Sequence, residues 1–324
     1  MWSAFTRQDL DFRILIAHRE RVTVAKPGRR WRAHRRQAIV SSFGPCLIQG
    51  RRSLPIRDVA SHPIPDLISL SNRRAVITGG ARGIGRAIAA RFAEAGAEVA
   101  LADVRRDEAE SAAADLSARF GRRVVAIEAD VTNPDAVAAL ADQAEARLGP
   151  LDIWVNNAGI YPSRPLLEIP VDEWDGVMDL NVRGVFLCTR EIGRRWVAQA
   201  RGGVIVNINS MGAFKTGPGV AHYITSKHAV VGLTRTAAVE LGPHGIRVLG
   251  VAPSMTQTEG RQEFLASVDT PGMDAFITEM EQRTPLGRIG VPDDVARVVL
   301  FCASDMAILM TGSTLMVDAG EGVL

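Results

Sequence analysis

The fold is decided by the stretch Arg74-Ala75-Val76-Ile77-Thr78-Gly79-Gly80-Ala81-Arg82-Gly83-Ile84-Gly85, in which a short apolar run ends in a glycine-rich turn. An apolar helical pattern follows over residues 86–94. Glycine permits unusual backbone angles and lets a phosphate group approach backbone N–H groups closely. A glycine turn between a strand and a helix therefore predicts a dinucleotide site, whereas without a ligand it is only a tight turn. The candidate contacts are Gly79, Arg82, Gly83, Ile84 and Gly85.

Strand-like and helix-like segments alternate along the rest of the chain. Strands are predicted at residues 75–78, 98–102, 124–128, 151–155, 204–208, 247–251 and 314–317, and helices at 86–94, 107–120, 171–181, 184–200, 221–241 and 293–303, with another helix starting at Pro134. Such alternation forms parallel βαβ units with right-handed crossovers. The prediction is an α/β fold: a doubly wound Rossmann-type sheet of seven mostly parallel strands, with helices on both faces.

Asp103 closes the second predicted strand, eighteen residues after Gly85. A carboxylate at this place accepts hydrogen bonds from ribose hydroxyls and repels a 2′-phosphate, which favours NAD over NADP. Arg82, Arg105 and Arg106 favour the opposite choice, because arginine pairs with phosphate. The carboxylate occupies the place of the extra phosphate, whereas the arginines can turn to solvent. NAD is therefore the predicted cofactor, and NADP is less favoured.

Tyr223 and Lys227 are four residues apart in the predicted helix 221–241, and Ser210 precedes the tyrosine by thirteen residues. Side chains at positions i and i+4 share one helix face, so a phenol and an ammonium are neighbours. A free tyrosine has a pKa of about 10, and nearby positive charge lowers it. Lys227 and a nicotinamide cation are expected to make Tyr223 a general base, with Ser210 holding the substrate oxygen. Alone, this spacing is a weak signal that also occurs on packed or solvated helix faces.

As a set, these residues resemble the classical short-chain dehydrogenase/reductase family over about residues 72–324. The motifs that carry the resemblance are the glycine turn, Asp130-Val131, Asn156-Asn157-Ala158-Gly159, Asn181, Ser210, Tyr223, Lys227, Pro253, Thr311-Gly312 and Val317-Asp318-Ala319-Gly320. The resemblance implies an enzyme that moves a hydride between a nicotinamide cofactor and an alcohol or ketone. It implies a catalytic tetrad of Asn181, Ser210, Tyr223 and Lys227.

Further cofactor contacts are also implied by the resemblance. They are Asp130 and Val131 at the adenine, Asn157, Ala158 and Gly159 along the cofactor, Pro253, Thr256 and Thr258 near the nicotinamide and pyrophosphate, and Tyr223 and Lys227 at the nicotinamide ribose. Asn181 is expected to support a water chain that carries a proton from Lys227 to solvent. Asn209, Ser254 and Ala319 stand where the family more often has serine, glycine and glycine. None of the three belongs to the tetrad.

The substrate is left open by the sequence. The expected pocket walls are Ile160, Tyr161, Met211, Gly212, Lys215, His222 and Met255, with His222 interpreted as a wall or surface residue, and residues 255–286 are expected to form a lid. This mixed wall suits sugars, polyols, small hydroxy compounds or 3-oxoacyl thioesters. The favoured function is an NAD-dependent secondary-alcohol dehydrogenase. The alternatives are an NADPH-dependent 3-oxoacyl thioester reductase and a non-catalytic dinucleotide sensor or scaffold.

Composition is that of an ordinary globular protein, with 324 residues that are 47% hydrophobic and 23% charged. Cys46, Cys188 and Cys302 are far apart and lack histidines at ligand spacing, which predicts a cytoplasmic protein without disulfides or a metal site. No apolar run is long enough to span a bilayer, so no membrane partner is predicted. The resemblance implies a homotetramer or homodimer built on the helices 184–200 and 221–241.

The first seventy residues differ from the remainder. They carry thirteen Lys or Arg against five Asp or Glu, a balance of +8, so residues 71–324 carry −6. The predicted division is an Arg-rich extension over residues 1–70 and a single Rossmann-fold catalytic domain over residues 71–324. The extension is interpreted as a disordered tail or a misplaced start; a mitochondrial transit peptide and an Arg-rich nucleic-acid arm are the alternatives. The acidic body predicts no nucleic-acid partner for the folded part.

Overall fold

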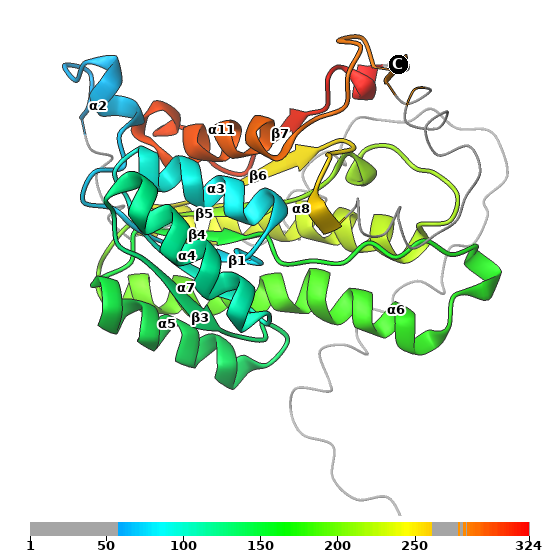
Figure 1. Ribbon diagram of the computed structural model, residues 1–324, viewed down its shortest axis with the longest axis horizontal. Helices are drawn as coiled ribbons and strands as arrows, with labels where there is room; N and C mark the ends of the chain where they lie inside the picture. The colour runs from blue at the N-terminus through cyan, green and yellow to red at the C-terminus, as the bar shows by residue number, and fades with distance from the viewer. Residues whose placement is uncertain (1–57, 261–277, 279–280, 283, 324) are drawn as a thin grey trace, which may run out of the picture. The chain divides into compact units, whose positions relative to one another are not determined.

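The computed structural model describes residues 58–260, 278, 281–282 and 284–323. Its strands form one seven-stranded sheet in the order β3-β2-β1-β4-β5-β6-β7, with every neighbouring pair parallel (Figure 1). The strands are β1 (Arg74–Thr78), β2 (Glu98–Asp103), β3 (Val124–Glu128), β4 (Ile153–Asn156), β5 (Gly203–Ile208), β6 (Ile246–Pro253) and β7 (Thr314–Val317). The predicted Rossmann-type sheet is therefore confirmed.

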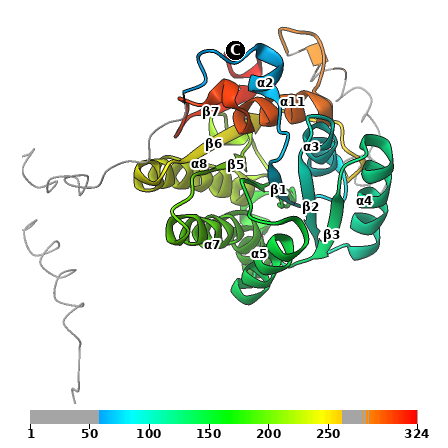
Figure 2. The same cartoon turned by 90° about the vertical axis from the view of Figure 1, so that its left-hand side faces the viewer.

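Helices cover both faces of the sheet. They are α2 (Ile64–Ile68), α3 (Gly83–Glu94), α4 (Arg106–Phe120), α5 (Pro134–Leu148), α6 (Val171–Met178), α7 (Val185–Ala198), α8 (Ala221–Leu241) and α11 (Pro292–Ala303). Short helical turns are η1 (Leu166–Glu168), η3 (Met211–Ala213), η4 (Gly242–His244), η5 (Asp305–Ala307) and η6 (Glu321–Val323). Helices α3, α4 and α11 lie on one face, and α5, α7 and α8 lie on the other (Figure 2).

Two apolar cores result from the alternation of side chains along each strand. In β1, Ala75 and Ile77 enter the core beneath α3 and α11, whereas Val76 enters the core beneath α5 and α7. Each core contains one cysteine: Cys302 is 0% exposed in the first, and Cys188 is 1% exposed in the second. Burial raises the pKa of both thiols to about 12, so both remain protonated and unreactive at neutral pH.

One element differs from its prediction. The sequence predicts separate helices at residues 171–181 and 184–200, but the structure joins α6 and α7 through a π-helical segment, η2 (Asp179–Gly184). A π-helical turn shifts backbone hydrogen bonds from i+4 to i+5 and is frequent at functional sites. It places Asn181 inside a continuous helix, where the side chain is fully buried.

Part of the predicted N-terminal extension lies within the described residues. Helix α2 contacts η5, and Leu70 is 1% exposed in the core beneath α3. The Leu70 N–H donates to the Ala95 carbonyl over 2.8 Å. All described residues belong to one unit, Arg51–Leu324. Apolar packing against the sheet therefore begins at least one residue before the predicted boundary at residue 71.

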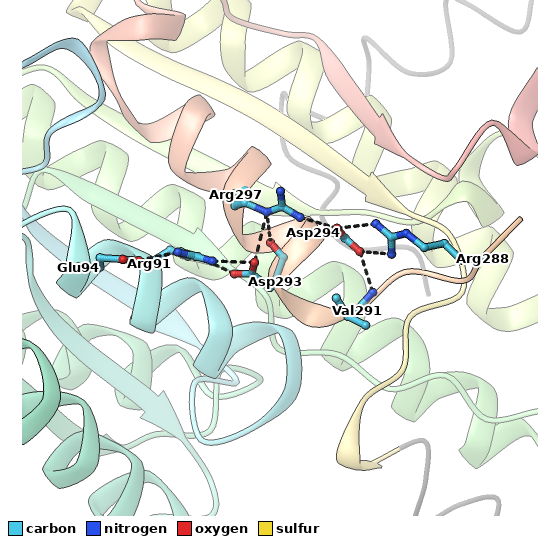
Figure 3. Close-up of polar contacts among 7 residues, drawn as sticks. All are labelled: Arg91, Glu94, Arg288, Val291, Asp293, Asp294 and Arg297. Carbon is cyan, nitrogen blue, oxygen red and sulfur yellow. Dashed lines mark hydrogen bonds and ion pairs between the residues drawn. The ribbon is translucent and has the colours of Figure 1, made fainter. Parts of the chain in front are cut away.

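Helix α11 is fixed to its surroundings by ion pairs at its first turn (Figure 3). Asp293 accepts two hydrogen bonds from Arg91 of α3, over 2.6 and 2.7 Å. Asp294 accepts two from Arg288 and one from the backbone N–H of Val291. Arg288 is the main reason that the pKa of Asp294 falls to about 2. Carboxylates at a helix N-terminus also interact favourably with the helix dipole.

Candidate active site

The glycine turn lies at the carboxyl end of β1. Gly79 and Gly83 have φ angles of +63° and +57°, which side chains disfavour. A Cβ added to Gly85 would come within 2.7 Å of Asn157 Nδ2. Asn157 in turn donates to the carbonyls of Thr78 and Gly79, both over 2.9 Å. The Asn157 amide thus fixes the path of the turn, and residue 85 has no room for a side chain.

The turn ends at the N-terminus of α3, which has no side-chain cap at Arg82. The Gly83 N–H donates to Glu259 Oε2 over 2.9 Å, and Thr258 lies beside the same glycine. Backbone N–H groups at a helix N-terminus bind anions, and here one of them already holds a carboxylate. The site therefore fits the phosphate groups of a dinucleotide, and Gly79, Gly83, Gly85 and Thr258 are the residues that could hold them.

Asp103 is 4% exposed at the end of β2. Its carboxylate accepts hydrogen bonds from the N–H groups of Ala81 and Arg105, each over 3.1 Å. The Arg105 guanidinium lies 3.5 Å from the same carboxylate. Arg106 instead pairs with Glu110 over 2.8 Å. Asp103 is therefore a fixed negative charge next to the glycine turn.

Tyr223 and Lys227 occupy one face of α8, as their spacing predicts. Lys227 Nζ lies 5.6 Å from the centre of the Tyr223 ring and donates to the Ile208 carbonyl over 3.0 Å. Burial lowers the pKa of Lys227 to about 8. Burial also raises the pKa of Tyr223, and a hydrogen bond with Ser210 opposes that rise. In the protein chain alone, the lysine thus does not produce the lowered phenol pKa that the sequence suggests.

Asn181 lies next to this pair. Its Nδ2 donates to the Ile160 carbonyl and to Ser226 Oγ, over 2.8 and 3.1 Å, and its Oδ1 accepts from the Ile160 N–H over 2.9 Å. A Cβ on Gly159 would lie 3.0 Å from Asn181 Oδ1 and 3.9 Å from Lys227 Nζ. Asn181, Gly159 and Lys227 are therefore brought together at one point.

The other predicted cofactor residues follow different strands of the same sheet edge. Asp130 is exposed and accepts hydrogen bonds from the N–H and hydroxyl of Thr132. Val131 is 5% exposed and packs beside Gly184. The Ala158 N–H donates to Thr78 Oγ1 over 3.1 Å. These contacts leave Asp130 open to a ligand, whereas Val131 and Ala158 mainly support the neighbouring backbone.

Beyond β6, which ends at Pro253, Thr256 Oγ1 donates to the Ser254 carbonyl over 3.1 Å. Thr256 also forms an isolated parallel bridge with Gly290. Most of the predicted lid lies outside the described residues, including Arg261, Glu263, Asp269, Asp274, Glu279 and Arg283.

Tyr161 and Ile160 are 51% and 43% exposed near Tyr223, and the two tyrosine rings pack edge to face with centroids 6.3 Å apart. His222 differs from its prediction as a wall or surface residue, because it is 0% exposed. It faces Glu173 of α6 instead, at 3.3 Å. The sequence does not predict the contacts of Glu173, its partner Arg164 or Glu259. Their contacts join segments far apart in the chain, and no local pattern marks them.

Two classes of site find no support in the described part of the chain. No group of three or more His, Cys, Asp or Glu side chains there is placed to hold a metal ion. Likewise, none of the described helices has the length and apolar character required to cross a membrane.

Comparisons with known proteins show a family likeness over most of the chain. Residues 79–321 match the profile of a family described as enoyl-(acyl carrier protein) reductase. The chain is 36% identical to the L-rhamnose 1-dehydrogenase (NAD(P)(+)) of a Sphingomonas strain, over 78% of this chain and 96% of the relative. It is 38% identical to the 3-oxoacyl-(acyl-carrier-protein) reductase of Staphylococcus epidermidis, over 77% and 98%. A solved short-chain type dehydrogenase/reductase from Mycobacterium marinum is similar at a TM-score of 0.73 and 40% identity, over 79% and 98%.

Proposed function

The chain belongs to the classical short-chain dehydrogenase/reductase family, and from that premise we propose that it is an NAD-dependent oxidoreductase that interconverts a secondary alcohol and a ketone. One observation carries the proposal. Tyr223, Lys227 and Asn181 converge at Gly159, next to Ala158, which bonds the end of β1, and the Gly83 N–H of the turn after β1 already holds a carboxylate. A non-catalytic sensor of dinucleotides would have no use for the buried lysine at the phenol.

In oxidation, Tyr223 as phenolate removes the alcohol proton, and Ser210 holds the substrate oxygen as charge develops on it. When bound, an oxidised nicotinamide would supply the hydride acceptor and, until it is reduced, a positive charge beside Tyr223 and Lys227. Burial favours the neutral phenol, so ionisation of Tyr223 draws on that charge as well as on Lys227. Asn181 holds the backbone of Ile160 and supports a chain of water molecules that carries the proton from Lys227 toward solvent.

The cofactor preference is proposed from Asp103. Its buried carboxylate beside the turn disfavours a 2′-phosphate. A polyhydroxylated substrate such as a sugar is supported by the similarity to a rhamnose dehydrogenase. The second candidate is an NADPH-dependent 3-oxoacyl thioester reductase. The similarity to a 3-oxoacyl-(acyl-carrier-protein) reductase favours it, and Asp103 argues against it.

A homotetramer in the cytoplasm is part of the proposal. Phe186 and Val197 of α7 and Val239 of α8 are apolar and 43%, 36% and 60% exposed. A second copy of the chain would cover them, and light scattering of the purified protein measures the assembly.

The deciding experiment follows nicotinamide absorbance with NAD or NADP against sugars, polyols and other secondary alcohols. We expect turnover with NAD that falls by at least about a hundredfold in Tyr223→Phe. Fluorescence of bound NADH serves as the folding control and is expected to remain. Turnover in the phenylalanine variant equal to the original would refute the role of Tyr223. Activity only on 3-oxoacyl thioesters with NADPH would favour the second candidate.

A further inference from the structure

We propose that His222 is a positioning residue that fixes the first turn of α8 and thereby the Tyr223 phenol. The proposal rests on the proposed function for its kinetic consequences, but not for its structural ones. His222 directly precedes Tyr223 and is 0% exposed. A buried imidazole at this place must have partners for both ring nitrogens.

The first partner is the backbone of Tyr223. Helix α8 begins after Val220, whose side chain offers no acceptor. The Tyr223 N–H lies in the first turn, where backbone donors have no partner within the helix. His222 Nδ1 accepts this hydrogen bond over 2.9 Å. Because a backbone N–H can only donate, Nδ1 must be the unprotonated nitrogen. The histidine thus accepts the kind of hydrogen bond that an N-cap side chain accepts in other helices.

The second partner of His222 determines which ring nitrogen carries the proton. With Nδ1 as acceptor, Nε2 carries the hydrogen and donates to Glu173 Oε1 over 3.3 Å. Glu173 also accepts from the Arg164 guanidinium over 3.1 and 3.2 Å, and Arg164 is the main cause of its lowered pKa. The carboxylate is therefore ionised, which keeps the proton of His222 on Nε2.

The chain of contacts continues to the loop that precedes α8. The Arg164 N–H donates to the Gly219 carbonyl over 2.7 Å, one residue before Val220. These contacts therefore link three segments near the start of α8. Arg164 belongs to the loop after β4, Glu173 to α6 and His222 to α8 itself. Movement of that start would move Tyr223 relative to Ser210 and Lys227. His222 acts on the reaction only through this geometry.

The test compares His222→Leu, which removes both ring nitrogens, with His222→Asn, whose Oδ1 can occupy the place of Nδ1. His228→Leu is the matched control, because His228 is an exposed histidine on the same helix. In His222→Leu we expect kcat to fall about tenfold or more, with NADH affinity within about threefold of the original. The midpoint of the rising limb of the pH profile should move up by about one unit, because the phenol is no longer held beside both Lys227 and the bound nicotinamide cation. His222→Asn should restore both values, and His228→Leu should change neither.

A second readout does not depend on turnover. The chain has two tyrosines, Tyr161 and Tyr223, so labelling tyrosine with carbon-13 at the hydroxyl-bearing ring carbon gives two NMR signals, which Tyr161→Phe assigns. The titration midpoint of the Tyr223 signal in the complex with oxidised NAD, whose ring carries the positive charge, should rise in His222→Leu and return in His222→Asn. An unchanged midpoint in His222→Leu, or no recovery in His222→Asn, would overturn the role of His222. Absence of turnover in the original protein would count against the proposed function alone.

Discussion

Lys227 shows at the residue scale how function opposes stability. Its side chain is 6% exposed, and burial lowers its pKa from 10.5 to about 8. Burial of the ammonium therefore lowers the unfolding free energy at pH 7 by about 3 kcal/mol. The hydrogen bond from Lys227 to the Ile208 carbonyl offsets part of this loss. The charge that the proposed chemistry needs is thus a destabilising feature of the free protein.

Replacing Lys227 by Met should abolish turnover and raise the unfolding free energy at pH 7 by about 1–2 kcal/mol. A lowered lysine pKa means that the unfolded chain binds more protons between pH 8 and 10.5. The original protein therefore gains stability as pH rises through this window, and the advantage of the variant should shrink there. Thermal unfolding at pH 7 and pH 10 measures the difference. A variant less stable than the original at pH 7 would contradict the expectation.

Asp103 leads to a prediction about cofactor choice. Asp103→Asn removes the charge and keeps one of the two oxygens that accept from backbone N–H groups, so the preference for NAD over NADP should fall by about tenfold or more. Ratios of kcat/KM for the two cofactors measure it. Glu108→Gln is the control, because Glu108 also pairs with Arg105 but is 49% exposed. An unchanged ratio of kcat/KM in Asp103→Asn would show that residues other than Asp103 determine the cofactor preference.

At the scale of elements, helix α11 depends on a network of charges at its first turn. Asp294→Ala removes the partner of Arg288 and the acceptor of the Val291 N–H, which should lower the unfolding free energy by about 1–2 kcal/mol. Folding lowers the Asp294 pKa from 3.8 to about 2, so its contribution is complete above about pH 4 and is lost as the pH falls toward 2. Thermal unfolding of both proteins between pH 2 and 7 measures how the stability difference between them shrinks at low pH.

The control for this network is Asp115→Ala. Asp115 pairs with Arg86 on the surface and is 54% exposed, so the change should cost no more than about 0.5 kcal/mol. Equal losses of unfolding free energy in the two variants would show that the position of Asp294 at the start of α11 adds no stability.

Elements with a local signal could be predicted from the sequence. The helix 221–241 and the strand 314–317 have the predicted bounds, and the glycine turn has the predicted context. The π-helical segment could not be predicted, because one shifted turn leaves no periodic mark and Asn181 looks like a polar interruption. The pairing of His222 with Glu173 spans 49 residues, and that of Glu259 with Gly83 spans 176. Contacts of this kind depend on the finished fold.

For the whole molecule, the N-terminal boundary is a proposal that truncation can test. A chain starting at residue 58 keeps α2 and Leu70, so we expect it to retain activity and unfolding temperature. A chain starting at residue 72 lacks Leu70, which is 1% exposed, and should lose about 2–3 kcal/mol of unfolding free energy. Thermal unfolding and turnover of both chains decide the matter. Loss of activity in the longer chain would give residues 1–57 a role in the enzyme.

The two buried cysteines lie on opposite sides of the sheet. Cys302 belongs to the buried side of α11 and Cys188 to the buried side of α7, at 0% and 1% exposure. After Cys46→Ser, a thiol reagent can modify the chain only when one of the two layers separates from the sheet. Mass spectrometry of the labelled peptides would then time the opening of each layer independently. Equal labelling rates would mean one cooperative event, and unequal rates would identify the layer that detaches first.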